Sequence, residues 1–518
     1  MAHSKPYLYC LLAILIAFSS ACFFSSPEDP APGYLAIGIE SQPTHLDPRY
    51  ATDANSVRIS GLIYNSLLRA DANSQLQPEL AESWEMTDQQ TYRFYLRKGV
   101  RFHDGRPLTA ADVKHTYDSI LNPRNSSPRR APLKVLASVD PIGPYEIRFR
   151  LSEPHAPFLE HCTIGIVPEG ASATTDSKPP LGSGPFLLEA IHPGERVLLR
   201  ANPNYWEGKP SVPGLSFKIV PDAIVRVLEF KKGTIQFLQN DIEPDMLPWL
   251  KRNTDGVIDM KQGTTFQYIG INLQHPILRH QKVRQALAYA IDRDAIIHHL
   301  LKDQVTSASG LLSALHWAYD GAVHVWPYDP ENAKKLLDEA GYPDADGAGP
   351  NPRFKLSFKT TNLDLRRRIA EAFKEQLQRV GIELEIRTYE WGTFYGDIKK
   401  GNFHLFSLAW VGILDPDIYY NIFHSASVPP NGNNRGRYSN SEIDALVERG
   451  RRATDLGQRK IVYGQVQRIL AQDLPYIPLW WWKNVIVRKP EIRGFTPYPD
   501  GDLISLKAVS YRPSHPST

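Results

Sequence analysis

Two aspartates lie in a segment rich in aromatic residues, AWVGILDPDIYYNIFHS, which spans residues 409–425. Asp415 and Asp417 are separated by one proline, and Trp410 and Tyr419 lie close to them in the sequence. Carboxylates can act as the acid and base of glycoside hydrolysis, bind a metal ion, or pair with a cationic ligand. The sequence indicates no distant partner carboxylate, so a turn between a strand and a helix also explains each aspartate.

Other catalytic and metal-binding motifs are absent from the sequence. It contains no G-x-S-x-G, S-x-x-K, H-E-x-x-H or phosphate-loop pattern. Residues 181–185, LGSGP, lack the spacing of a nucleophile elbow, and a tight turn is predicted there. His298 and His299 are adjacent, so on a helix their side chains diverge by about 100° and do not share one metal. We therefore predict no catalysis, no cofactor and no bound metal.

The first residues have the order of an export signal. A lysine precedes an apolar stretch over residues 7–18, and small residues follow up to Cys22. A transmembrane helix needs about 20 apolar residues, and this stretch is shorter. The sequence SSAC that ends at Cys22 resembles the bacterial lipoprotein box, in which the cysteine carries lipid, although Ser19 stands where leucine is usual. We predict a lipoprotein signal peptide over residues 1–22, with plain secretion as the alternative.

Composition limits the remaining possibilities. Of the 3 cysteines, Cys10 lies in the predicted signal peptide and Cys22 would carry lipid, so Cys162 has no disulfide partner. An exported chain without disulfides depends on a large core for its stability. A length of 518 residues predicts more than one domain, since a domain has about 150 residues. The net charge of +3, with no long run of one sign, argues against a nucleic-acid partner. Residues 23–33, FFSSPEDPAPG, predict a flexible tether.

Alternation and helical periodicity predict a mixed α/β chain. Residues 145–151 alternate apolar and polar side chains as a half-buried strand does, and Thr109 can cap a helix. In the later half, a helix is predicted over 365–380 and a strand over 382–386. Helices that lead into strands favour a sheet whose faces are mostly covered. Further helices are predicted over 330–340, 441–453 and 458–472.

Several long motifs occur in order along the chain. They are AESWEMTD at 81–88, YRFYLRKGVRFHDGRPLTAADV at 92–113, GSGPF at 182–186, ANPNYWEGKP at 201–210 and VRQALAYAIDR at 283–293. Together they resemble the oligopeptide/dipeptide-type extracytoplasmic solute-binding proteins of ABC importers, which form solute-binding protein family 5. The resemblance extends over most of the chain beyond the tether.

The resemblance implies a two-lobed, periplasmic-binding-protein-like α/β fold of the large class II type. Such a fold has a ligand cleft between its lobes and an accessory α+β domain. The expected domains are a first-lobe main domain over 34–69, 180–265 and 488–512, an accessory domain over 70–179, and a second lobe over 266–487.

The resemblance also implies a function. A peptide or other small molecule would bind between the lobes, which would close by a hinge and deliver the ligand to an ABC permease in the inner membrane. We expect a periplasmic or otherwise extracytoplasmic monomer, held to the membrane by lipid on Cys22. The alternatives are a receptor for a non-peptide solute and a signalling or surface lipoprotein without an import role.

Candidate ligand-binding residues follow from the same resemblance. Trp410 matches a tryptophan that faces the cleft, and in peptide-binding members an aspartate three residues later pairs with the ligand's α-ammonium. Ile413 occupies that position here, so Asp415 is the nearest replacement, with an Asp-Pro turn as the alternative. Arg435, with Arg437, could bind a ligand carboxylate, or both arginines could be solvated. The other candidates are Ser41 and Thr44 in the first lobe and Tyr268 and Tyr419 in the second.

Overall fold

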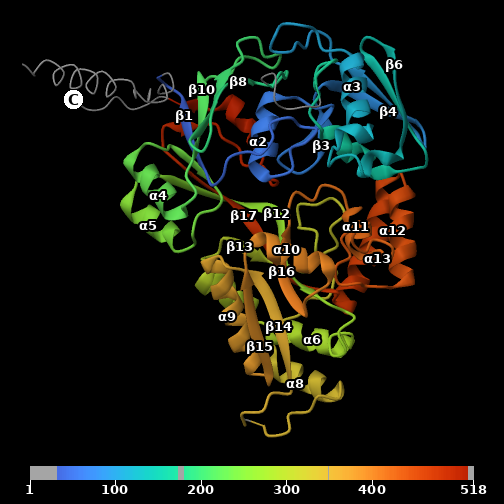
Figure 1. Cartoon of the computed structure of the whole chain (residues 1–518), viewed down its shortest axis with the longest axis vertical. Helices are drawn as coiled ribbons and strands as arrows, with labels where there is room; N and C mark the ends of the chain where they lie inside the picture. The colour runs from blue at the N-terminus through green and yellow to red at the C-terminus, as the bar shows by residue number, and fades with distance from the viewer. Residues whose placement is uncertain (1–31, 173–179, 348, 512–518) are drawn as a thin grey trace, which may run out of the picture.

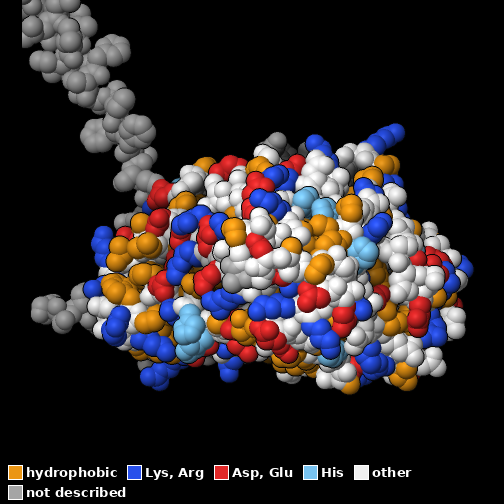
Figure 2. All heavy atoms as spheres, turned by 90° about the horizontal axis from the view of Figure 1, so that it is seen from below, with side chains coloured by type: hydrophobic (Ala, Val, Ile, Leu, Met, Phe, Trp, Pro, Cys, Tyr) orange, Lys and Arg blue, Asp and Glu red, His pale blue; other side chains and the backbone are white. Residues whose placement is uncertain are grey.

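The computed structural model describes residues 32–172, 180–347 and 349–511 (Figure 1). The predicted signal peptide, Cys22 and most of the predicted tether lie outside these residues. Within the described ranges, no helix combines the length and the apolar character needed to cross a membrane. Basic and acidic side chains are interspersed over the face seen in Figure 2, in keeping with the small net charge.

One 11-stranded sheet runs through both lobes, in the order β15-β14-β16-β12-β17-β11-β1-β10-β9-β8, with β13 paired to β17. The first lobe contains β1 (Leu35–Ile39), β8 (Phe186–His192), β9 (Arg196–Ala201), β10 (Gly214–Ile219) and β11 (Phe237–Gln239). The second lobe contains β13 (Val305–Ser307), β14 (Phe354–Thr361), β15 (Ile382–Tyr389) and β16 (Leu405–Trp410). The two lobes share β12 (Val257–Ile271) and β17 (Tyr476–Arg488).

The shared strands change lobe at an interruption of their pairing. Residues 257–262 of β12 pair with 483–488 of β17, and after a register shift Phe266 pairs with Trp481. A Cβ atom at Gly263, inside the shift, would lie 2.5 Å from the carbonyl oxygen of Trp482, so only glycine fits here without movement. The two shared strands therefore pass from one lobe to the other beside a glycine, Gly263. The shift lies beside the boundary expected after residue 265, and the domain boundaries stay predictions.

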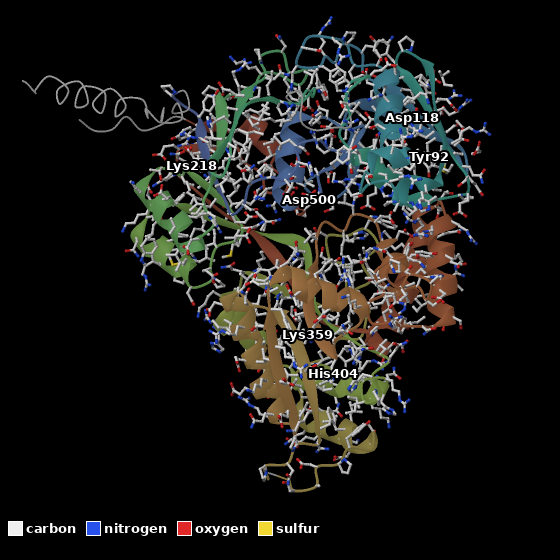
Figure 3. All side chains as sticks on the ribbon, viewed as in Figure 1. Tyr92, Asp118, Lys218, Lys359, His404 and Asp500 are labelled. Carbon is white, nitrogen blue, oxygen red and sulfur yellow. The ribbon has the colours of Figure 1, made fainter. Side chains whose placement is uncertain are left out.

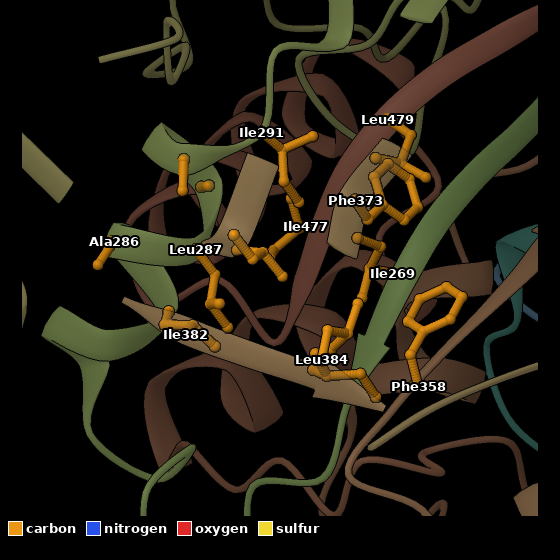
Figure 4. Packing of buried hydrophobic residues seen from close by; sticks show 14 of the residues in the cluster. Ile269, Ala286, Leu287, Ile291, Phe358, Phe373, Ile382, Leu384, Ile477 and Leu479 are labelled. Carbon is orange, nitrogen blue, oxygen red and sulfur yellow. The ribbon is translucent and has the colours of Figure 1, made fainter. Parts of the chain in front are cut away.

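Helices cover the second-lobe sheet, as its sequence predicts. Ile369, Phe373 and Leu377 form the buried stripe of α9, which leads through a glycine turn into β15. Figure 4 shows Phe373 packed with Ile269 of β12 and Ile477 of β17. The helices of this lobe are α6 (Gln281–Ala290), α7 (Arg293–Ala295), α8 (Pro330–Glu339), α9 (Asp364–Gln378), α10 (Trp391–Lys400), α11 (Ile418–Phe423), α12 (Ser441–Arg452) and α13 (Leu456–Asp473).

A separate α+β unit lies beside the first lobe, where Figure 3 labels Tyr92 and Asp118. Its four-stranded sheet has the order β4-β5-β7-β6. Thr109 is the N-cap residue of α3, as predicted, and the Asp112 carboxylate accepts a hydrogen bond from its backbone nitrogen at 2.7 Å. The elements of the unit are β2 (Leu68–Ala70), β3 (Leu76–Pro78), β4 (Ala81–Asp88), β5 (Thr91–Leu96), α3 (Ala110–Leu121), β6 (Leu136–Gly143), β7 (Glu146–Leu151) and the 3-10 helix η3 (Ala156–Thr163). The remaining elements are α2 (Ala54–Ile63), α4 (Ala223–Lys232), α5 (Met246–Asn253), β18 (Ile492–Arg493) and β19 (Ser510–Tyr511).

The predicted tight turn at LGSGP is an extended segment with a bend only at its end. The backbone nitrogen of Gly184 donates to the carbonyl of Ile63 at 2.8 Å. A Cβ at Gly182 would lie 1.9 Å from the same carbonyl oxygen. These glycines therefore allow the segment to approach the end of α2, which the sequence pattern alone did not indicate.

Candidate ligand-binding site

Three large apolar side chains remain exposed where parallel strands of the second lobe end. Leu363 follows β14, Trp391 follows β15 and Val411 follows β16, and each is more than half exposed. Both β15 and β16 pair with β14 in parallel, so their carboxyl ends lie at one edge of the sheet. Ligands of open α/β sheets bind outside this edge. We call these three residues, together with Tyr395, Trp410 and Arg435, the second-lobe wall.

The helix α10 and the strand β16, which carry Trp391, Tyr395 and Trp410, lie at the end of the second lobe that is nearer the first (Figure 1). Arg368, in the first turns of α9, pairs with Asp245 of the first lobe at 3.1 Å. Arg366 of the same helix donates to Gln267 of β12, one of the shared strands, at 3.0 Å. The edge that exposes apolar side chains is therefore also the edge at which the lobes meet.

Three of the predicted site residues meet at this wall. The Tyr268 ring stacks on Tyr476 with centroids 4.0 Å apart and lies parallel to Trp410 at 6.4 Å. The Arg435 guanidinium lies 4.9 Å from the Trp410 ring and donates to the Tyr268 hydroxyl at 3.1 Å. Tyr268, Trp410 and Arg435 thus form one cluster from three segments that are distant in sequence.

Two aromatic residues of this site were not predicted. Tyr395 lies 5.4 Å from the Arg435 guanidinium, and its ring stacks on Trp391 at 5.4 Å. Both residues belong to α10, within the sequence EWGTFY that follows β15. The signal that could have identified them is this aromatic run directly after a predicted strand.

Asp415 and Asp417 are both held by arginines. The Asp415 carboxylate accepts two hydrogen bonds from Arg459, at 2.8 and 2.6 Å, and Asp417 accepts two from Arg451, at 2.9 and 2.7 Å. The backbone nitrogen of Asp417 also donates to Asp415 at 2.8 Å. An ammonium group would have to compete with a bidentate ion pair at Asp415, so the geometry favours a structural role over the predicted counter-charge role.

Ile413 and Tyr419 belong to the interior of the second lobe. Ile413 is buried, and Tyr419, 2% exposed, packs against Phe423 and Tyr463. Tyr419 also borders a cavity of about 40 Å³, which is far below the several hundred Å³ of a ligand pocket. Tyr419 therefore supports the loop after β16 from within the core, and this burial corrects its prediction as a ligand-binding residue.

The first-lobe candidates are exposed and fixed to α2. The hydroxyl of Thr44 donates to Asp53, the N-cap of that helix, whose carboxylate also accepts from the backbone nitrogen of Ser56 at 2.8 Å. The backbone oxygen of Ser41 accepts from Asn55 at 2.9 Å. The loop that carries Ser41 and Thr44 is thus held in one conformation by side chains of α2, and their contact with a ligand stays a prediction.

The α+β unit contacts the second lobe through η3 and α12. Burial, together with the nearby Asp415 and Asp417, raises the pKa of Glu160 in η3 to about 8, against the opposing effect of Arg459 and Arg129. Burial lowers the pKa of His161 to about 4. At neutral pH the Glu160 carboxyl and the His161 imidazole are therefore mostly uncharged.

Glu160→Gln should stabilise the protein increasingly as the pH rises. A raised native pKa means that the stability from Glu160 is present below its usual value of 4.5 and is lost as the pH approaches 8. We expect the free energy of unfolding of the variant to exceed that of wild type by about 1 to 3 kcal/mol at pH 8 and by little at pH 5. Denaturant unfolding across this range measures the difference. Glu153→Gln, an exposed neighbour, is the control, and parallel pH curves for Glu160→Gln and wild type would refute the interpretation.

Among the described residues, no group of three or more His, Cys, Asp or Glu side chains is arranged to hold a metal ion. The candidate site instead consists of aromatic rings, exposed apolar side chains and a guanidinium. Such groups bind and orient organic molecules.

Comparison with known proteins identifies the family. The model of the bacterial extracellular solute-binding proteins, family 5 Middle, matches residues 75–430. The oligopeptide-binding protein AppA of Bacillus subtilis is 29% identical, over 96% of this chain and 97% of its own. Heme-binding protein A of Haemophilus influenzae is 30% identical, over 89% of each chain.

The solved structure of Bacillus subtilis AppA in complex with a nonapeptide matches with a TM-score of 0.78 and 29% identity, over 93% of this chain and 99% of that one. The two-lobed α/β fold expected from the sequence is thereby confirmed, as is the resemblance from which it was inferred. The chain belongs to family 5 of the bacterial extracellular solute-binding proteins.

Proposed function

We propose that this protein is the solute-binding component of an ABC importer for peptide-type ligands. The observation that carries the proposal is the second-lobe wall, which lies at the carboxyl edge of the sheet and beside the strands that join the lobes. Relatives include an oligopeptide-binding protein and a di/tripeptide-binding protein. The ligand is captured between the lobes, which close about β12 and β17, and is then delivered to a membrane permease.

Closure strengthens each contact with the ligand. Removing water lowers the effective dielectric constant around hydrogen bonds to the peptide backbone and around charged end groups. The second-lobe wall supplies apolar contact through Trp391, Leu363 and Val411, while Ser41 and Thr44 are proposed to face the ligand from the first lobe. Asp415 is proposed to support the wall through Arg459.

A receptor for a non-peptide solute is the second candidate. One relative is a heme-binding protein, and the family resemblance aligns the apolar Ile413 with the aspartate that pairs with a ligand's ammonium in peptide-binding members. A buried ammonium without a partner costs several kcal/mol. This candidate predicts ligands without a free amine.

The mature protein is proposed to be an extracytoplasmic monomer without catalytic activity, anchored by lipid on Cys22. The order of a basic residue, an apolar stretch and small residues before Cys22 supports this proposal. Several acyl chains, each contributing about 0.8 kcal/mol per buried methylene, would make the attachment lasting.

Thermal unfolding with peptide libraries tests the proposed function. A ligand at about 100 times its dissociation constant stabilises the folded protein by about 2.7 kcal/mol, which raises the melting temperature measurably. Dipeptides to nonapeptides should give such a shift in wild type and a smaller one in Trp410→Ala. Trp84→Ala, in the α+β unit, is the matched control. If no peptide shifts the melting curve whereas heme does, the second candidate replaces the first.

A further inference from the structure

The outward face of α4 carries three apolar side chains that remain about half exposed. Ile224, Val225 and Leu228 are 51%, 44% and 47% exposed. At about 100° per residue they occupy one arc of the helix, while Val227 and Phe230 are buried on the other side. A helix on the surface of a protein ordinarily exposes charged and polar residues there. An exposed apolar face rimmed by polar residues marks a site of interaction with a protein or a membrane.

Basic side chains adjoin the apolar face of α4. Four of them are exposed in the last turns of α4 and α5: Lys231, Lys232, Lys251 and Arg252. Among the described residues, no carboxylate oxygen lies within 4.0 Å of any of the four. The acidic residues closest to them in sequence are already paired, Glu229 with Lys218 at 3.7 Å and Asp255 with Lys489 at 2.8 Å. The end of the first lobe that carries these four residues, which we call the basic end, therefore has an excess of positive charge.

The basic end lies where the chain enters the first lobe. The backbone nitrogen of Gln236 donates to the carbonyl of Ala36, the second residue of β1, at 2.9 Å. The Gln236 side chain accepts from the nitrogen of Ala36 at 2.8 Å and donates to Gly233, the C-cap of α4, at 2.6 Å. Lys231 lies 5.1 Å from the Trp249 ring of α5, so the two helices lie side by side here. Both helices are on the side of the first lobe that faces away from the α+β unit (Figure 1).

The length of the predicted tether limits how far this end can lie from the membrane. Residues 23–33 join Cys22 to Tyr34, which directly precedes β1. A chain of this length spans at most about 40 Å even when it is fully extended. Lipid on Cys22 would thus keep the basic end closer to the bilayer than any part of the second lobe needs to be. Lysine and arginine side chains next to an apolar helix face are the groups that bind anionic lipid surfaces.

We infer that the basic end of the first lobe and the apolar face of α4 lie on the anionic surface of the membrane that holds the anchor. The inference rests on the lipid proposed for Cys22 and goes beyond it, because it assigns the face of the folded protein that meets the bilayer. Ile224, Val225 and Leu228 enter the headgroup region, and the basic side chains contact lipid phosphates. The first lobe is then the part held at the membrane, and the second lobe remains free to move about β12 and β17.

Sedimentation with lipid vesicles tests this inference. The protein used is residues 23–518, which lacks lipid but keeps every residue that the structure describes. It should bind phosphatidylcholine vesicles that contain phosphatidylglycerol and not those without it, and added salt should release it. The double variant Lys231→Gln, Lys232→Gln should bind about thirtyfold more weakly. The double variant Ile224→Ser, Leu228→Ser should bind about tenfold more weakly, because less apolar area leaves water.

Two further double variants are the matched controls. Lys334→Gln with Lys335→Gln changes adjacent lysines of α8 that are already paired with glutamates. Leu456→Ser with Ile461→Ser removes apolar side chains of α13 that are 62% and 64% exposed. Both controls should bind the vesicles as wild type does.

The outcomes separate the inference from the proposals on which it rests. Failure of wild type to bind the anionic vesicles, or equal losses in the α4 variants and the controls, overturns the inference. If wild type does not bind the vesicles but the α4 variants lower ligand uptake by cells, this face docks on the permease instead, and the inference is likewise overturned. Incorporation of labelled fatty acid at Cys22 tests the anchor alone, and the melting shift with peptides tests the proposed function alone.

Discussion

Arg459→Leu is expected to lower the free energy of unfolding by about 3 to 5 kcal/mol, the range for breaking one side of a buried ion pair. Arg459 is almost fully buried and binds both oxygens of Asp415, whose side chain is only 12% exposed. Its Nε also donates to the carbonyl of Gly450 at 3.0 Å. The substitution leaves a buried carboxylate unpaired and a carbonyl without its donor. Denaturant unfolding measures the loss.

Arg367→Leu is the matched control, because Arg367 pairs with Asp364 at 2.7 Å while both side chains are more than half exposed. Exposed pairs contribute about 0 to 1 kcal/mol. Adding Asp415→Leu to Arg459→Leu should recover part of the loss, because the unpaired charge is then removed. If Arg459→Leu lowers the free energy of unfolding no more than the control does, the pair of Arg459 with Asp415 does not stabilise the loop after β16.

Gly263→Ala is expected to destabilise the protein by about 3 kcal/mol, since overpacking against fixed atoms costs this much. The added methyl group would lie 2.5 Å from the carbonyl oxygen of Trp482 and 3.3 Å from that of Pro499, and backbone atoms cannot turn aside as a side chain can. Because the shared strands change lobe here, the variant should also bind ligand more weakly. Thermal unfolding and calorimetry measure the two effects.

Gly61→Ala provides the contrast. Gly61 lies in α2, and an added Cβ would meet no atom within 4 Å. Alanine should stabilise this helix by up to about 1 kcal/mol. If both alanine variants unfold like wild type, the hinge strands tolerate a side chain and Gly263 has no special role.

The sequence predicted local elements well where a cap or a stripe specifies them. The helix that begins after Thr109 is an example, because its cap and its acceptor Asp112 are three residues apart. The stripe of Ile369, Phe373 and Leu377 likewise specifies α9. The pairing of β12 with β17 was not predictable from periodicity, because it joins residues more than two hundred positions apart. The two-lobed arrangement came from family resemblance.

The candidate site shows the same limit. Trp410 and Tyr268 were predicted, but the ion pair that occupies Asp415 involves Arg459, 44 residues later. No local pattern indicates that pairing, so the sequence predicted that Asp415 could bind a cationic ligand. Tyr395 was overlooked because an aromatic residue at helical spacing has no individual signature; only the fold brings it to Arg435.

The central claim is that the lobes close on a peptide-type ligand by bending at β12 and β17. Spin labels on Lys209→Cys in the first lobe and Lys374→Cys in the second report the distance between the lobes, and the buried Cys162 stays unlabelled. Double electron–electron resonance should show a broad, longer distance distribution without ligand and a narrower, shorter one with a peptide that raises the melting temperature. An identical distribution with and without such a peptide would contradict the account.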